Sequence, residues 1–359
     1  MTPTVKILAD LRCRYGGIGR VQQAMIDRCP PWAEVVDLHV RCRYGHPLST
    51  ARIAQSLRKA RSKSPAVFWS CGFVPPLYST VPVAVTVHDF TPLTQGYYGA
   101  ARRTYYNGVL KPLYRRCEAV VCDSHYTRSE LLKWSGLRPE RVHVVSLGVD
   151  PSYSTNRTST SMGYRYVFYA GNHRPHKNLA RLIRAYRHSR LREENVHLVL
   201  TGHGEPDLGA IIGGLGLDEH VHFIGHVPES ELPRVYRGAV AVAYVSLSEG
   251  FGLPILEAMA SDTPVITSDL TSMPEVAGDA ALIVDPFSIE AIAAALDRIV
   301  LDEALRDDLV RRGRERLGTF QWDESARTFW DLMRRLARQE SYAPSGTSPG
   351  RNGPSGSSG

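Results

Sequence analysis

The residues best suited to chemistry lie in the segment SLSEGFGLPILEAMAS, residues 246–261. Seven residues separate Glu249, on a predicted loop, from Glu257, on a predicted helix. Carboxylates accept hydrogen bonds from hydroxyl groups. We therefore expect Glu249 to bind sugar hydroxyls and Glu257 to bind a ribose diol. The alternative is a solvated loop carboxylate followed by an ordinary helical one.

The turn between these carboxylates predicts the start of a helix. Pro254 suits the first helical position, which places the N–H groups of Phe251, Gly252 and Leu253 at the helix N-terminus. Unpaired N–H donors and the positive end of the helix dipole attract phosphate. We expect these backbone groups to bind a phosphate.

A second candidate phosphate site lies in YAGNHRPHKNLARLIRAY, where Arg174 and Lys177 fall between a predicted strand and a helix. A guanidinium can make a bidentate contact with a diphosphate, and an ammonium adds a point charge. We expect both cations to be exposed in the empty cleft. A basic surface loop without a ligand is the alternative.

The segment VAVTVHDFTPL places His88 and Asp89 at the end of a predicted strand. Open α/β sheets bind ligands at the carboxyl ends of their strands, so both side chains are candidates for contact with reacting groups. A capping Asp beside an incidental His is the alternative. Ser124, in DSHYTRSEL, is a further candidate for the same cleft.

Glycine turns follow two of the predicted strands. Gly16, Gly17 and Gly19 follow the first strand, and Gly202 and Gly204 follow HLVL in the second half. Glycine permits close approach of a ligand to the backbone, which makes Gly17 and Gly202 candidates for contact with a nucleotide. Tight packing or a dinucleotide site would also account for GGIG.

We expect no metal site and no disulfide. The six cysteines include no C-x-x-C pair, and no group of His, Asp and Glu has metal-ligand spacing. The cysteines are therefore expected to be reduced thiols.

Strand and helix patterns alternate along the chain and predict mainly parallel sheets, hence an α/β fold class. The strands predicted in the first half are VKILAD, EVVDLHV, AVFWS, VAVTVHD, AVVCDS and VHVVSLG. Those predicted in the second half are YVFYAG, HLVLTG, VHFIG, AVAYVS and PVITS. Residues 288–317 are expected to be helical, and FQWDESARTFWDLMRRLARQ predicts a final helix across the domain junction.

A length of 359 residues fits two domains with a cleft between them. The polar segment PSYSTNRTSTSMG predicts the linker. The expected parts are an N-terminal domain, a linker, a C-terminal domain, a crossing helix and a disordered tail, over residues 1–150, 151–163, 164–318, 319–340 and 341–359.

Charge is distributed unevenly between the halves. Residues 1–150 hold 21 Lys and Arg against 10 Asp and Glu, while the remainder holds 22 against 26. The basic half predicts an anionic partner: a membrane surface, a phospholipid-linked acceptor or nucleic acid. No long apolar run and no signal-peptide pattern occur, so we expect a cytoplasmic protein.

Residues 41–63 contain seven Lys and Arg but no Asp or Glu. Ile53, Leu57 and Ala60 share one helical face there. One hypothesis is peripheral contact of this face with anionic lipid at the inner face of the membrane. The alternative is a cationic helix that packs these residues on its own sheet.

EGFGLPILEAMA resembles the E-x7-E signature of family 4 glycosyltransferases, retaining enzymes built from two facing Rossmann-like domains (the GT-B architecture). GNHRPHKNL resembles the family's G-x5-K-N-L segment, and DSHYTRSEL resembles its S-x-x-[ST]-x-x-x-L segment. HDFTPL and GNHRPHKN are similar to loops of bacterial mannosyltransferases that use GDP-mannose. The resemblance extends over about residues 5–335.

The resemblance implies a role for each candidate residue. Arg174 and Lys177 hold the donor diphosphate, His88 contacts the transferred sugar, and Asp89 faces the acceptor. The loop of Gly17 lies near the donor phosphates. Gly202 approaches the nucleotide. GGIGR is shorter than the family's glycine loops, which leaves Arg20 without an implied role.

The implied activity is transfer of a hexose from a nucleoside diphosphate sugar, with GDP-mannose favoured over UDP-sugars, to a saccharide, glycolipid or small-molecule acceptor. His88, Asp89 and Glu249 are the catalytic candidates. No metal and no cofactor are implied, since Arg and Lys neutralise the departing diphosphate. A non-hydrolysing sugar-nucleotide epimerase is the closest alternative. An oxidoreductase and a nucleic-acid-binding protein are less consistent with an incomplete glycine fingerprint and the lack of a nucleic-acid motif.

Overall fold

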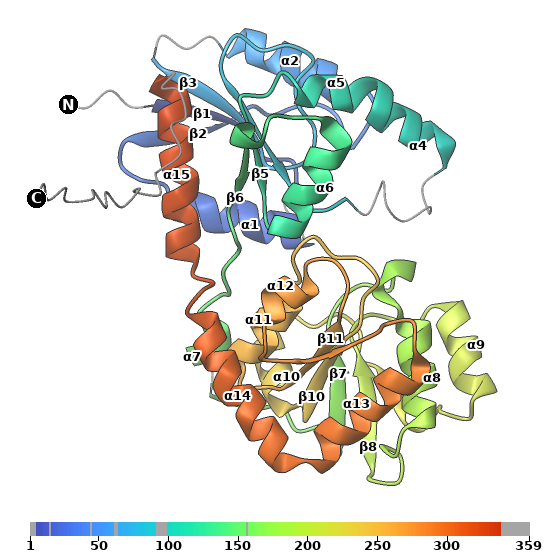
Figure 1. The fold of residues 1–359 in the computed structure, drawn as a ribbon. Helices are drawn as coiled ribbons and strands as arrows, with labels where there is room; N and C mark the ends of the chain where they lie inside the picture. Colours follow the sequence, from blue (N-terminus) through green and yellow to red (C-terminus); the bar gives the residue numbers. More distant parts are fainter. Residues whose placement is uncertain are drawn as a thin grey trace, which may run out of the picture.

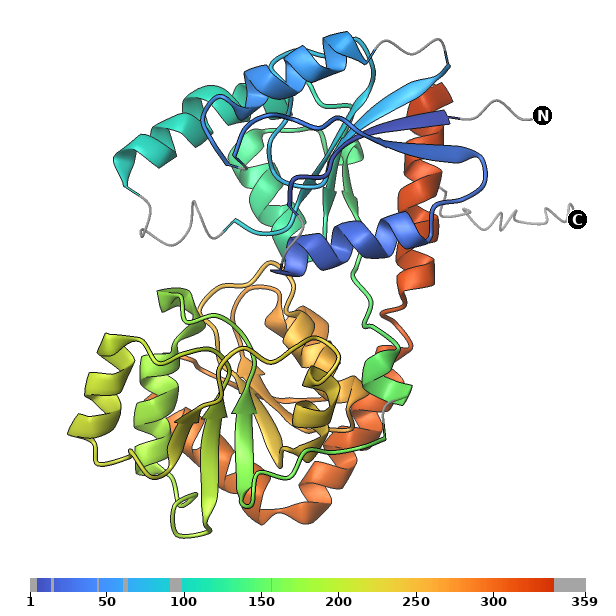
Figure 2. The same cartoon turned by 180° about the vertical axis from the view of Figure 1, so that it is seen from behind.

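Two six-stranded parallel sheets form the framework of the molecule. The computed structural model describes residues 5–13, 16–43, 45–60, 64–90, 99–155 and 157–338. The sheets belong to two domains that face each other, and helices pack on the faces of both sheets (Figures 1 and 2). This arrangement confirms the predicted α/β fold class with two Rossmann-like domains.

The N-terminal sheet has the strand order β2-β1-β3-β4-β5-β6. Its strands are β1 (Val5–Asp10), β2 (Ala33–Asp37), β3 (Ala66–Ser70), β4 (Val83–Val87), β5 (Ala119–Cys122) and β6 (Val142–Val144). Its helices are α1 (Gly16–Asp27), α2 (Ser49–Lys59), α4 (Ala100–Tyr105), the π-helix η1 (Tyr106–Leu110), α5 (Lys111–Tyr114), α6 (His125–Ser135) and the 3-10 turn η2 (Pro139–Arg141). The central strands β3, β4 and β5 are buried along their whole length, as expected for a parallel sheet covered on both faces.

The C-terminal sheet has the strand order β12-β11-β10-β7-β8-β9. Its strands are β7 (Arg165–Tyr169), β8 (Val196–Leu200), β9 (Val221–Phe223), β10 (Ala241–Tyr244), β11 (Val265–Ser268) and β12 (Leu282–Val284). Its helices are η3 (Pro175–Lys177), α8 (Leu179–His188), α9 (Pro206–Gly214), α10 (Leu232–Gly238), α11 (Leu253–Ala260), α12 (Met273–Ala277), α13 (Ile289–Leu301) and α14 (Glu303–Leu317).

The strand order reverses between β1 and β3 in one domain and between β7 and β10 in the other. Ligands of doubly wound sheets bind in the crevice at such a reversal, outside the carboxyl ends of the strands. The loops after β1, β3, β7 and β10 flank these reversals and are therefore positioned to form a site. Gly17, Arg174 and Glu249 lie in or beside loops of this group, whereas the other candidate loops follow the nearby strands β4, β5 and β8.

Two segments connect the domains, one in each direction. The first runs from β6 to the short helix α7 (Ser152–Thr155), within the predicted linker, and the second runs from α14 to α15 (Trp322–Arg338). The segments touch at Gly148, where a Cβ would lie 2.4 Å from the backbone nitrogen of Trp322. Only glycine fits such an approach of two backbones.

Helix α15 packs against the N-terminal domain, although α14 belongs to the C-terminal one (Figure 1). Its Trp330 indole donates a hydrogen bond to the carbonyl of Met25 in α1, and Phe329 packs against Trp69 of β3. The apolar face predicted for this helix is thus buried under the first domain, so the chain crosses the junction twice.

Helix α2 shows how the basic segment of residues 41–63 is placed. Ile53 and Leu57 are buried in the core with Phe68, and Ala60 is partly buried against it. The apolar face proposed for lipid contact therefore packs on its own sheet, while Arg58 is exposed. Residues 61–63 and the predicted disordered tail, residues 341–359, lie outside the described part of the chain.

All six cysteines are free thiols. Burial raises the pKa of the Cys71, Cys117 and Cys122 thiols above the usual range. Over the residues that the structure describes, no helix has both the length and the apolar character needed to cross a membrane.

Candidate functional site

A cavity of about 1400 Å³ lies between the two domains. Most candidate site residues named from the sequence line it: Gly17, His88, Asp89, Arg174, Lys177, Gly202, Glu249, Phe251, Gly252, Leu253 and Glu257. Ser124 is buried and does not line the cavity. The lining segments follow strands of both sheets, so the carboxyl ends of both sheets face this space. The volume exceeds that of a typical pocket for one ligand and leaves room for two substrates.

Lys177 and Glu249 form an ion pair on the C-terminal side of the cavity. The Lys177 Nζ lies 2.7 Å from Glu249 Oε1 and donates to the Tyr244 hydroxyl at 3.0 Å. Burial alone would raise the pKa of Glu249, but Lys177 outweighs it and lowers that pKa. Burial alone would lower the pKa of Lys177, but Glu249 outweighs it and raises that pKa. Both groups are therefore charged.

The burial of Lys177 corrects one expectation. Its side chain is only 11% exposed, because it lies at the end of η3 and turns towards Glu249, whereas we expected an exposed cation. Arg174, at the start of the same turn, is exposed as expected. The two cations thus differ in role before any ligand binds: one is already paired and one faces the open cavity.

Glu257 is buried in α11 with both carboxylate oxygens engaged. Its Oε2 accepts a hydrogen bond from the Tyr236 hydroxyl at 2.8 Å, and its Oε1 pairs with the Arg20 guanidinium. Arg20 belongs to α1 of the N-terminal domain, and Glu229 of the C-terminal domain lies 3.5 Å from it. The sequence left Arg20 without a role. The structure makes it a charged link across the cleft.

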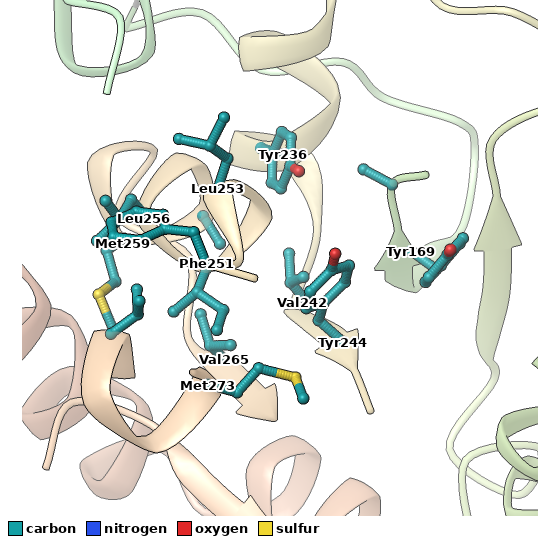
Figure 3. Close-up of a cluster of buried hydrophobic side chains, with 14 of the residues drawn as sticks. Tyr169, Tyr236, Val242, Tyr244, Phe251, Leu253, Leu256, Met259, Val265 and Met273 are labelled. Atoms are coloured by element: carbon teal, nitrogen blue, oxygen red, sulfur yellow. The ribbon is translucent and has the colours of Figure 1, made fainter. Parts of the chain in front are cut away.

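The N-terminus of α11 opens on the cavity as the glycine turn predicts. Gly252 precedes the helix with a φ of +110°, a conformation that favours glycine, and Leu253 is the first helical residue, so Pro254 takes the second position. Phe251, Leu256 and Met259 pack with Met273 and Val265 (Figure 3). This buried cluster fixes the direction of the first-turn N–H groups, which have no acceptor within the helix.

His88 lies at the carboxyl end of β4 with both ring nitrogens bonded. Its Nδ1 lies 2.7 Å from Asp123 Oδ2, and its Nε2 lies 2.9 Å from the carbonyl oxygen of Cys71. The carbonyl only accepts hydrogen bonds, so Nε2 donates to it, and Nδ1 shares a hydrogen bond with the Asp123 carboxyl group. Burial alone would lower the pKa of His88, but Asp123 outweighs it and raises that pKa. Both ring nitrogens are therefore occupied by hydrogen bonds within the protein.

An aromatic wall lines the N-terminal side of the cavity. Phe73 stacks on Tyr106 with ring centroids 5.7 Å apart, and Trp134 contacts Phe90 and Tyr114 edge-on. Arg43 and Arg102 line the same side. Flat apolar rings beside cations suit the carbon face of a sugar and its polar groups.

Sequence reasoning missed several of these residues because their partners are distant in the chain. Asp123 follows β5, which pairs with β4 in the register Val87 to Cys122, so His88 and Asp123 are neighbours at the sheet edge. The sequence alone does not show that the two residues are close, because their proximity depends on the order of the strands in the sheet. The aromatic wall gave no signal, since its members come from four separate segments.

The described residues include no group of three or more His, Cys, Asp or Glu arranged to hold a metal ion.

Two family models match consecutive parts of the chain. The one described as Glycosyltransferase Family 4 matches residues 26–153, and the one described as Glycosyl transferases group 1 matches residues 155–316. With the two Rossmann-like domains and the E-x7-E segment at their cleft, these matches place the chain in a family: it belongs to the family 4 glycosyltransferases of the GT-B architecture.

Curated relatives include bacterial mannosyltransferases. O-antigen chain mannosyltransferase B of Escherichia coli is 29% identical over 252 residues, which cover 66% of each chain. The O-antigen chain mannosyltransferase RfbU of Salmonella typhimurium is 30% identical over 65% of each chain. The matched part therefore spans slightly less than two thirds of the length of these relatives.

Solved structures share the fold across nearly the whole chain. Sucrose-phosphate synthase of Thermosynechococcus elongatus aligns with a TM-score of 0.76 at 17% identity, covering 94% of this chain and all of that one. HepE of Anabaena, in complex with UDP and glucose, aligns with a TM-score of 0.70 at 16% identity over 92% of this chain and 99% of that one. These similarities establish the GT-B fold.

Proposed function

We propose that the protein is a retaining mannosyltransferase that uses a nucleoside diphosphate sugar, with GDP-mannose preferred to UDP-sugars. The observation that carries this proposal is one cavity that unites two cations, a helix N-terminus and two carboxylates on the C-terminal side with His88 opposite. The mannosyltransferases among the relatives support the choice of sugar. An acceptor with a saccharide, glycolipid or small-molecule hydroxyl group completes the reaction.

The donor would lie along the C-terminal side of the cavity. Arg174, Lys177 and the N–H groups of Phe251, Gly252 and Leu253 bind the diphosphate, because all are donors that meet at one end of the sheet. Glu257 binds the ribose, Gly202 lies against the nucleotide, and Gly17 closes over the phosphates from the other domain. Glu249 binds hydroxyl groups of the transferred sugar.

Transfer would proceed on the front face of the sugar. The bond between the anomeric carbon and the phosphate oxygen breaks as the acceptor oxygen bonds to the same carbon, and the departing phosphate takes the acceptor proton. Lys177, Arg174 and the α11 N-terminus stabilise the charge that develops on this phosphate. The reaction then needs neither a metal ion nor a cofactor.

His88 and Asp89 are proposed to contact the sugar and the acceptor. His88 does so through its ring carbons, because both its nitrogens are already hydrogen-bonded within the protein. Asp89 is exposed on the cavity and faces the acceptor side. Phe73 and Trp134, the partly exposed members of the aromatic wall, supply apolar surface for the acceptor.

Contact with anionic lipid is a second proposal, about location. Leu48, Leu77 and Tyr78 are exposed large apolar residues, and Leu77 donates a backbone hydrogen bond to Thr50 at the start of α2. Exposed Arg58 lies on the same helix. The protein should sediment with anionic vesicles at low salt and be released as salt rises. A protein that stays in the supernatant at low salt excludes this proposal. No nucleic-acid partner is proposed.

A panel of GDP-, UDP- and TDP-sugars tests the activity and the donor. The protein should release GDP from GDP-mannose when an acceptor is present, whereas an epimerase would convert the sugar without net release of nucleotide. The preferred donor should also raise the melting temperature most, since a ligand at 100 times its Kd stabilises by about 2.7 kcal/mol. Conversion to an epimer, or no turnover of any donor, would reject the proposal.

A further inference from the structure

The two domains are joined by direct hydrogen bonds at the N-terminus of α6. Glu275, in α12 of the C-terminal domain, accepts bonds from the backbone N–H of His125 at 2.8 Å and of Tyr126 at 3.0 Å. These N–H groups have no acceptor within their own helix, and the helix dipole makes this end positive. The carboxylate therefore binds an N-terminus that belongs to the other domain.

A second pair of bonds lies beside the first. The hydroxyl groups of Ser124 and Thr127 both donate to the carbonyl oxygen of Gly250, at 2.7 Å and 3.0 Å. Ser124 also accepts from the Thr127 N–H, so it caps α6 and contacts the other domain at once. Gly250 directly follows Glu249, the proposed sugar-binding residue.

The backbone at Gly250 also meets His88. A Cβ at this position would lie 1.6 Å from the carbonyl oxygen of His88, so only glycine permits the approach. The loop after β10 and the end of β4 are thus in contact through backbone alone. Any separation of the domains must break this contact together with the four hydrogen bonds.

Glu275 is tied to the donor loop within its own domain. The Ser272 hydroxyl donates to the carbonyl oxygens of Glu249 and Phe251, and Thr271 accepts from the Glu249 N–H. Both lie next to α12, which carries Glu275. The hydrogen bonds that hold α12 to α6 therefore also restrain the position of the loop that carries Glu249.

We propose that Glu275, Ser124 and Thr127 form a closure latch that holds the loop of Glu249 and Gly250 against the end of β4 at His88 in the closed enzyme. Glu275 does not line the cavity, so it acts as a positioning residue and makes no contact with substrate. Free nucleotide would bind mainly to the C-terminal domain. The latch should therefore act on turnover and leave nucleotide affinity unchanged. Its effect on turnover rests on the proposed function, whereas its effect on closure does not.

The test compares full-length wild type with Glu275→Ala, Glu275→Gln and the control Asp279→Asn. Asp279 is an exposed carboxylate just after α12, and its described partner, Arg312, is in the same domain. Three quantities are measured: amide hydrogen exchange at His125 and Tyr126, the Kd of free GDP, and kcat with the donor identified by the panel.

Glu275→Ala should speed exchange at both amides and lower kcat roughly 5- to 30-fold, while the Kd of GDP changes less than about twofold. The range for kcat takes the stability effect of a lost helix cap as the loss of stability of the closed state. Glu275→Gln keeps one acceptor and should give an intermediate result. Asp279→Asn should match wild type in all three measurements.

Unchanged exchange and unchanged kcat in Glu275→Ala would overturn the latch. A parallel loss of GDP affinity and kcat would overturn it too, because it would show damage to the donor site. If Glu275→Ala does not fold, Glu275→Gln decides by the same measurements. If wild type shows no transfer, the proposed function fails, and exchange at His125 and Tyr126 still decides whether the latch exists.

Discussion

At the level of single residues, the ion pair of Lys177 and Glu249 sets the charge of the empty cavity. Each side chain is almost buried and is charged because of the other. A diphosphate that approaches Lys177 must share this cation with Glu249. Arg174, which is exposed, is free of that constraint and can reach the phosphates first.

We predict different consequences for the two cations. Arg174→Ala and Lys177→Ala should each lower kcat/KM roughly 10- to 150-fold, since each removes a charge-assisted phosphate contact of about 1.5 to 3 kcal/mol. Only Lys177→Ala should lower the melting temperature, because it leaves the Glu249 carboxylate buried without its cation. Steady-state kinetics and thermal unfolding measure both effects.

The control for these variants is Arg184→Ala, an exposed cation on α8 that does not line the cavity. It should retain wild-type kinetics. Wild-type kinetics in both Arg174→Ala and Lys177→Ala would remove the diphosphate assignment.

Substitution of the two carboxylates should affect the binding of the nucleotide and of the sugar differently. Glu257→Ala should weaken both free GDP and GDP-mannose, because the ribose is common to them. Glu249→Ala should weaken GDP-mannose more than free GDP, because it removes a contact to the sugar. Titration calorimetry with the two ligands measures the difference, and each variant is the control for the other. Equal GDP affinity in Glu257→Ala and wild type contradicts the ribose role.

Much of the site could be predicted from single residues because the relevant signal is local. Glu249, the glycine turn and Glu257 follow one another within one short segment. Residues that are close in this sequence are therefore also close in the structure. Arg20 could not be assigned in this way, since its partner Glu257 lies in the other domain. Glu275 gave no signal, because a carboxylate on a five-residue helix looks like any surface acid.

At the level of elements, the strand patterns predicted most of both sheets, because fully buried parallel strands are continuous apolar runs. The short elements α12 and β12 were not predicted, since neither is long enough to show a period. The helical stretch of residues 288–317 is divided into α13 and α14 at Asp302. That side chain accepts a hydrogen bond from the Leu305 N–H and starts the second helix.

His143 in β6 makes the stability of the folded protein depend on pH. Burial, with Arg335 of α15 and Arg128 of α6, lowers the pKa of this histidine to about 4. A histidine with a lowered pKa is neutral in the folded protein and takes up a proton more readily on unfolding. Its contribution to stability is therefore present above about pH 6.5 and is lost as the pH falls towards 4.

We predict that His143→Gln reduces the loss of stability on acidification. Between pH 7 and pH 5 the histidine should account for on the order of 2 kcal/mol of the change in unfolding free energy. Urea unfolding of wild type and variant at both pH values measures it. The same pH dependence in the two proteins would show that His143 titrates normally.

At the level of the whole molecule, the cavity exists only because the two domains face each other. Its donor side comes from one sheet and its acceptor side from the other, and α15 returns the chain to the first domain. The sequence predicted this division from the linker and the alternating patterns. It could not predict the contacts between the domains, because these depend on their relative orientation.

The stereochemistry of the product tests the central claim most directly. The protein is incubated with GDP-α-mannose and a panel of saccharide and glycolipid acceptors, and the anomeric carbon of the new linkage is examined by NMR. We predict an α-mannosyl product with one equivalent of GDP released, since front-face transfer keeps the donor configuration. A β-linked product would contradict the retaining mechanism. An altered sugar still attached to the nucleotide would contradict glycosyl transfer itself.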